Sequence, residues 1–308
     1  STFYLFFIWI IYNSKNFSYR LAVLSISLYG VLDNFGIEGG KNGYFDIDTI
    51  GKQDGAFAVL FFFSNFFIIK QIISSKKYKN ENLLFILLLV TFAIQYRIFG
   101  FLSLVGVSII VFQNFKKINF KFFLFPLILG IVWSVKNYLT TSCLIFPVAF
   151  SCLPSLWSNK YLAILQNEEL RFFHKAYNIN SESIFEWYFK WSDRYLNYYI
   201  SINLFVSLLI IILFLHIFFK FSNKNNGINF FIFIYVLFLL IAWMLSAPSI
   251  RFGSGIFILI ISSYSLFFSD LRFPKLDKLF SQKSMLLLLV FLTVFSTPLF
   301  ENYKNVES

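Results

Sequence analysis

The chain has 308 residues, of which 58% are hydrophobic and only 13% are charged, and its formal net charge is +11. A soluble domain is nearer half apolar and a quarter charged, so one aqueous core cannot hide this much apolar surface. The composition excludes an ordinary soluble enzyme and predicts a membrane protein built from transmembrane helices. No soluble module contains a basic stretch interleaved with aromatics, so we expect no nucleic-acid partner.

Apolar runs separated by polar clusters predict about ten spans, because roughly 20 apolar residues cross a bilayer. We therefore expect an all-α, polytopic helix bundle that forms a single domain over residues 1–308. The first run, STFYLFFIWIIYN, is too short for a complete span, which predicts that the chain begins inside a helix of a longer protein. The expected spans are 1–13, 17–32, 55–73, 83–95, 98–114, 122–138, 198–219, 229–246, 253–268 and 284–299.

Basic residues are unevenly distributed between the two alternating sets of connections. One set holds 15 basic and three acidic residues, whereas the other holds 11 basic and 12 acidic residues. Connections rich in Lys and Arg stay in the cytoplasm, so the first set is predicted to be cytoplasmic. The external face then carries the long connections, at about 33–54 and as an insertion at about 136–197, and we expect a functional site there.

Acidic residues gather in the first long external connection, which includes Asp46, Asp48 and Asp54. Carboxylates beside a membrane act as general bases or as ligands of a hard divalent cation, although a solvated acidic loop is the simpler interpretation. Asp54 lies directly before GAFAVLFFF, where an ionised group needs a partner or water. Lys52 is the candidate partner, and a cap at the helix N-terminus is the alternative role for Asp54.

Four cations lie at four predicted external helix ends: Lys52, Arg97, Lys136 and Arg251. Each one alone is explained as an interfacial anchor whose charge reaches out to water. Together, on an otherwise acidic face, they favour convergence on one pocket, and Arg suits phosphate through its bidentate fork.

The insertion contains both cysteines of the chain, Cys143 and Cys152. Because they lie close together on the oxidising face, we predict a disulfide, with two buried thiols as the alternative. Two amphipathic helices are expected to follow, at 161–177 and 181–199. The second carries Trp187, Trp191 and Tyr195 on one stripe, which predicts a helix on the outer leaflet that either covers a pocket or lies free.

These landmarks together resemble the GT-C class of integral-membrane glycosyltransferases, especially its bacterial members of unassigned acceptor. The resemblance covers about residues 45–268. The motifs that carry it are Lys52-Gln53-Asp54 at a helix entry, Arg97 at the end of an inner hairpin, Lys136-Asn137-Tyr138 at a helix exit followed by Pro147, and the late turn with Pro248, Arg251 and Phe252.

The resemblance implies a multi-pass protein of the bacterial inner membrane that transfers a hexose from a polyprenyl-phosphate donor during cell-surface glycan synthesis. In this class an acid in the first external loop is the general base; here that loop is expected before Ser1, which makes Asp54 the second acid of the class and Asp46 and Asp48 weaker candidates. Lys52, Arg97, Lys136, Asn137 and Arg251 would bind the donor's phosphate and sugar.

The sequence by itself implies no cofactor, but some members of the class use a divalent cation. The predicted partners are membrane lipid and the polyprenyl-linked sugar. Three other functions remain open: a flippase, which would show inverted repeats and charges in mid-membrane; a polymerase of lipid-linked glycans; and a non-catalytic membrane protein.

Overall fold

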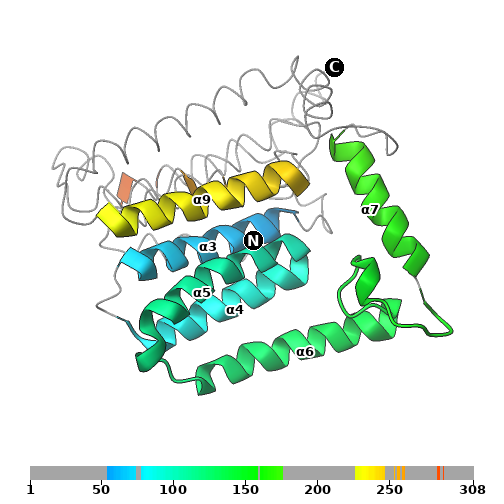
Figure 1. Cartoon of the computed structure of the whole chain (residues 1–308), viewed down its shortest axis with the longest axis horizontal. Helices are drawn as coiled ribbons and strands as arrows, with labels where there is room; N and C mark the ends of the chain where they lie inside the picture. The colour runs from blue at the N-terminus through cyan, green and yellow to red at the C-terminus, as the bar shows by residue number, and fades with distance from the viewer. Residues whose placement is uncertain are drawn as a thin grey trace, which may run out of the picture. The chain divides into compact units, whose positions relative to one another are not determined.

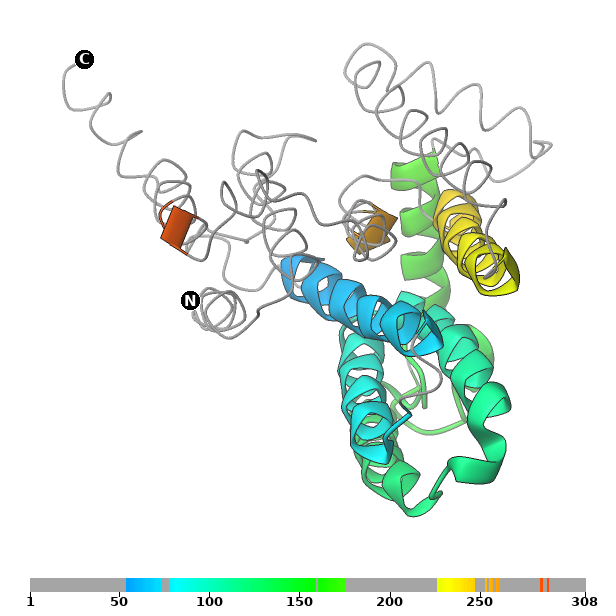
Figure 2. The ribbon, with the colours of Figure 1, turned by 90° about the vertical axis from the view of Figure 1, so that its left-hand side faces the viewer.

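The computed structural model describes residues 54–73, 78–158, 160–175 and 226–246, with single positions between 253 and 287. Every regular element in these ranges is a helix, as expected (Figures 1 and 2). The helices long and apolar enough to cross a membrane are Ala56–Ile73, Ile98–Lys117 and Lys121–Thr141, and the shorter apolar helices are Asn80–Tyr96 and Phe231–Ser246.

These five helices coincide with five of the ten predicted spans. The predicted spans at 1–13, 17–32 and 198–219 lie outside the described residues, and those at 253–268 and 284–299 lie mostly outside them. Ten spans therefore remain a prediction, whereas three membrane-length helices are a property of the structure.

The chain divides into two compact units, one formed by Ser1–Phe66 with Ser254–Ser308 and the other by Phe67–Gly253. In the first unit, helix α3 (Asp54–Ile73) begins with a run of buried phenylalanines. A Cβ on Gly255 would lie 2.9 Å from the Ala58 carbonyl oxygen, so the chain at position 255 runs directly against the α3 backbone.

In the second unit, the last turns of α3 and helix α4 (Asn80–Tyr96) form an antiparallel hairpin. The rings of Phe67 and Phe85 meet edge to face with centroids 5.3 Å apart. One turn further along, Asn82 Nδ2 donates to Gln71 Oε1 at 3.3 Å. The residue number rises from Phe67 to Gln71 in α3 and falls from Phe85 to Asn82 in α4. The two helices are therefore antiparallel.

A tight turn leads from α4 into the 3₁₀ turn η4 (Ile98–Leu102) and helix α5 (Ser103–Asn114). Gly100 is buried, and a Cβ there would lie 2.6 Å from the backbone nitrogen of Ile94. The return of the chain along α4 therefore depends on a glycine, because no side chain fits between the two backbones.

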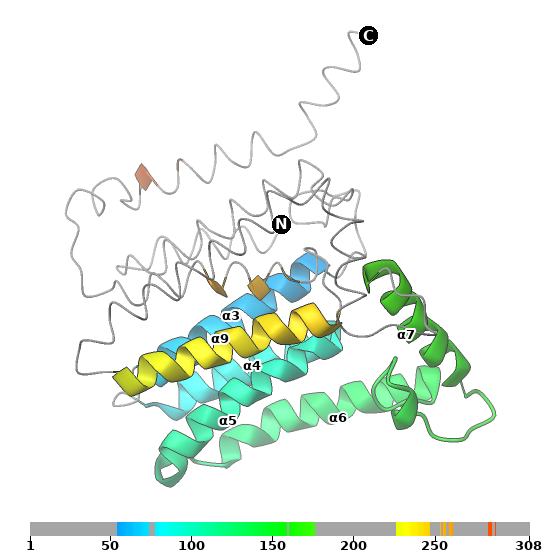
Figure 3. The ribbon, with the colours of Figure 1, turned by 45° about the horizontal axis from the view of Figure 1, so that its top comes forward.

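Helix α6 (Lys121–Thr141) follows a short 3₁₀ turn, η5 (Phe115–Lys117), and runs parallel to α4 (Figure 3). Near the start, Asn119 N–H donates to Asn80 Oδ1 at 3.1 Å, and further along Gln95 Nε2 donates to the Leu129 carbonyl at 3.4 Å. Beyond that contact α6 continues for 12 residues, or roughly 18 Å, past the end of α4.

Helix α9 (Asn226–Ser246) packs against α5 through a fully buried tyrosine. A Cβ on Gly106 would lie 2.6 Å from the Tyr235 hydroxyl oxygen and 2.6 Å from Ile68 Cγ2. Three helices of the second unit thus meet at Gly106, where the absence of a side chain lets α9 and the end of α3 come close to α5.

Candidate functional site

Arg97 forms the turn between α4 and η4. Its backbone is extended (φ −151°, ψ 138°), its N–H donates to the Ala93 carbonyl at 3.0 Å, and its carbonyl accepts from Gly100 N–H at 2.9 Å. The side chain is half-buried. The tight turn predicted for this residue is therefore present, and the turn holds the Arg97 backbone through hydrogen bonds on both sides.

Lys136 and Asn137 lie in the last turns of α6, with Lys136 exposed and Asn137 half-buried. The predicted helix exit at these residues is four to five residues early, because α6 ends at Thr141. The Thr140 hydroxyl donates to the Lys136 carbonyl at 3.0 Å, and the Thr141 hydroxyl donates to the Asn137 carbonyl at 2.8 Å. These side-chain bonds accompany one further turn of helix.

Arg97 and Lys136 share one end of the second unit because α4 and α6 run parallel. They stand at different heights, however. Gln95 is level with Leu129, and Lys136 lies seven residues further along α6, or about 10 Å. The structure therefore places the two cations at the same end of the second unit, with Lys136 further along the helix direction than Arg97.

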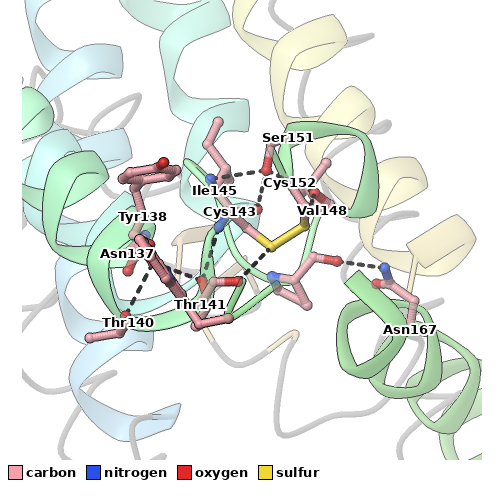
Figure 4. Close-up of a disulfide and its surroundings, with 12 residues drawn as sticks. Asn137, Tyr138, Thr140, Thr141, Cys143, Ile145, Val148, Ser151, Cys152 and Asn167 are labelled. Atoms are coloured by element: carbon pink, nitrogen blue, oxygen red, sulfur yellow. Dashed lines mark hydrogen bonds between the residues drawn. A yellow bond between two sulfur atoms is a disulfide. The ribbon is translucent and has the colours of Figure 1, made fainter. Parts of the chain in front are cut away.

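A disulfide between Cys143 and Cys152 closes a short loop directly after α6 (Figure 4). Ser142 ends the helix in the left-handed conformation (φ 59°), and its N–H donates to the Tyr138 carbonyl at 2.8 Å. Leu144 N–H donates to the Ser151 carbonyl and Leu153 N–H to the Ser142 carbonyl, at 3.1 and 2.9 Å. The pairing predicted from the sequence is thus part of a small antiparallel bridge.

Helix α7 (Lys160–Lys175) is attached to this loop and coincides with the first of the two predicted amphipathic helices. Asn167 Nδ2 donates to the Pro147 carbonyl at 2.8 Å, a contact that Figure 4 shows crossing from α7 to the loop. Trp157 lies in the sequence between the disulfide loop and α7. Its Nε1 donates to the Tyr138 carbonyl at 3.4 Å, and the rings of Trp157 and Tyr138 meet edge to face.

The opposite end of the second unit is basic. Lys79 precedes α4, Lys116 and Lys117 end the η5 turn, and Lys121 begins α6. Beside them, the Tyr78 hydroxyl donates to Asn80 Oδ1 at 3.0 Å, and burial raises the pKa of Tyr78.

Several predicted site residues are not placed by the structure. Asp54 is the first residue of α3, a position that suits either an N-terminal cap or a site residue, and the described part of the structure does not include its side chain. Asp46, Asp48, Lys52 and Arg251 lie outside the described residues, as does the helix predicted at 181–199. Among the described residues, no group of three or more His, Cys, Asp or Glu is placed to hold a metal ion.

Sequence reasoning missed two residues that position this end of the molecule. Gly100 determines how tightly the chain turns after Arg97, and Asn167 attaches α7 to the disulfide loop. A glycine three residues after a charged residue between two apolar runs is a usable signal for a tight helical turn. Asn167 has no such signal, because its partner is a backbone carbonyl 20 residues away.

A family model described as a domain of unknown function (DUF8201) matches residues 54–258. No curated protein and no solved structure matches the chain. The matched range covers about two thirds of the chain; it begins at Asp54 and includes Arg97, Lys136 and both cysteines, whereas Asp46, Asp48 and Lys52 precede it. The chain therefore belongs to the DUF8201 family.

Proposed function

We propose that this protein is a multi-pass glycosyltransferase of the bacterial inner membrane that transfers a sugar from a polyprenyl-phosphate donor on the external face, as the resemblance to the GT-C class implies. One observation carries the proposal. The end of the second unit that bears Arg97 and Lys136 also bears the disulfide, so cations suited to a phosphate lie on the side of the molecule where an external donor would bind.

Two independent features support this orientation. Disulfides form and persist on the oxidising side of a membrane, and the bridge follows directly after α6. Lysines flanking a span favour the cytoplasm, and Lys79, Lys116, Lys117 and Lys121 all gather at the opposite end.

The proposed reaction needs a base and a site for the departing charge. Asp54 takes the proton from the acceptor hydroxyl, whose oxygen attacks the anomeric carbon of the donor sugar. The bond between that carbon and the phosphate oxygen breaks, and polyprenyl phosphate leaves with the electron pair. Arg97 and Lys136, with Lys52 and Arg251 as further candidates, stabilise the phosphate as its charge grows. The polyprenyl chain stays in lipid throughout, which explains why charged groups lie at the entrances of membrane helices.

The first test replaces Asp54→Asn and measures transfer of labelled sugar from a polyprenyl-phosphate donor in membranes. Loss of a general base lowers the rate by about 10²–10⁴-fold while insertion stays normal. Glu81→Gln is the matched control, because Glu81 is an exposed acid at the opposite, basic end of the second unit. Transfer at the parental rate by the Asp54 variant would remove Asp54 from the reaction.

The second test measures binding of a non-hydrolysable polyprenyl-phosphate analogue to purified protein. Arg97→Ala and Lys136→Ala each weaken binding, whereas Lys116→Ala, which removes an exposed lysine from the other end, leaves it unchanged. Equal affinity in all three variants would refute the phosphate site. Movement of intact donor across vesicles without bond cleavage would instead identify a flippase.

A further inference from the structure

The disulfide loop and the turn after it form an exposed apolar surface. From Ser142 to Ser158 the chain contains no charged residue. Within this stretch Phe150 is 90% exposed, Leu156 is fully exposed, and Leu153 and Trp157 are about half-exposed. Exposed aromatic and aliphatic side chains gathered on one short loop mark a surface that is covered by something other than water.

The backbone of this loop makes several hydrogen bonds within the loop itself. The N–H groups of Val148, Ser151 and Cys152 donate to carbonyls within the loop, as do those of Leu144 and Leu153. The Ser151 hydroxyl accepts from Ile145 N–H at 3.0 Å and donates toward the Ile145 and Val148 carbonyls, so the main polar side chain of the loop is also used internally. Each internal hydrogen bond lowers the cost of moving the backbone of this loop out of water.

The apolar surface of the loop continues that of α6. Val132, Val135 and Leu139 are exposed along the last turns of the helix, on the face that also carries exposed Lys136. Cys143, the first residue of the loop, is two residues past the end of α6. Trp157 links the turn after the loop to α6 through its hydrogen bond to the Tyr138 carbonyl. Trp and Tyr are the residues that gather where a membrane helix reaches the interface.

We propose that residues 143–157 insert into the outer leaflet beside α6, with Phe150 and Leu156 in the acyl chains and Trp157 at the level of the headgroups. Lipid, not a protein, is the occupant, because the loop is uncharged, makes several of its own backbone hydrogen bonds and directly follows a membrane-length helix. This inference depends on α6 crossing a membrane and not on the proposed enzymatic activity.

The test places a photo-reactive benzoylphenylalanine at position 150 of the full chain, reconstituted into phosphatidylcholine vesicles. Illumination gives adducts with phosphatidylcholine, seen as a mass increase of one lipid on the loop peptide. Glu169, an exposed acid on α7, is the control position, and lipid adducts there are several-fold fewer. Position 156 is a second probe site, since a fully exposed side chain can be replaced without disturbing packing.

Lipid adducts at both probe positions, above the control, support the inference. Adducts to a second copy of the chain at these positions would overturn it and assign the loop to a dimer interface. Lipid adducts no more frequent than at Glu169 would also overturn it, and would place the loop in water. Sugar transfer need not be measured in this experiment, so its outcome does not depend on whether the proposed function is correct.

Discussion

Helices α3 and α6 are alike in length and apolar character, but their surroundings are opposite. In α3, 72% of the membrane-length stretch is buried, whereas in α6 only 6% is buried. The interior position of α3 is also visible in its polar residues, since Ser64 and Asn65 are fully buried and both donate to the Phe61 carbonyl. In α6 the one buried residue is Pro126.

The difference shows that the length and apolar composition of a segment do not reveal whether it lies in the interior or at the edge of a helix bundle. In α3 apolar side chains meet other side chains, so packing determines which residues are tolerated. In α6 about half of the side chains are exposed, and those on the face away from α4 meet the surrounding medium, which in a bilayer is lipid. Apolar residues in α3 therefore stabilise the fold by packing against other side chains. Exposed apolar residues in α6 instead suit contact with lipid.

The largest effect is expected from shortening a buried side chain in α3. Phe62 is 0% exposed, so Phe62→Ala leaves a cavity and lowers the free energy of unfolding by about 3–5 kcal/mol. Leu127→Ala in α6 removes a side chain that is 59% exposed and costs less than about 0.5 kcal/mol. Unfolding of both variants in mixed micelles by added denaturing detergent measures the difference. Equal losses would mean that α6 is as closely packed as α3.

A smaller effect is expected from opening the loop that follows α6. The double variant Cys143→Ser, Cys152→Ser removes a disulfide between residues nine positions apart in the sequence. Its loss costs about 2–3 kcal/mol of local stability. Hydrogen exchange should accelerate in residues 143–153, while the protection of α3 stays unchanged. Treating the parent protein with reductant should reproduce the effect. Faster exchange in α3 as well would show that the two regions unfold together.

The smallest of the three effects compares two glycines. Gly100→Ala forces a Cβ to within 2.6 Å of backbone and costs about 1–3 kcal/mol. Gly130→Ala in α6 meets nothing within 4 Å and gains about 0.5–1 kcal/mol from better helix propensity. Thermal unfolding followed by circular dichroism in detergent distinguishes the two. Destabilisation by Gly130→Ala would reveal a close neighbour on the outer face of α6.

The helices themselves were accessible from sequence because a span requires only a continuous apolar run. The predicted segments 55–73, 98–114 and 122–138 match membrane-length helices to within a few residues. The tight turn at Arg97 and the pairing of Cys143 with Cys152 also followed from local features. The end of α6 was placed too early, because a lysine and an asparagine suggested a helix exit where threonine hydroxyls accompany a further turn.

The sequence by itself determined the helical class, the three membrane-length helices and the cysteine pair, since each depends on composition or on short separations along the chain. Only the tertiary structure decided that α3 is interior and α6 peripheral, that Lys136 lies about 10 Å beyond the level of Gln95, and that Asn167 holds the disulfide loop. These depend on which helices touch, and such contacts arise from the fit of side chains and glycine gaps between distant segments, which apolar periodicity does not encode.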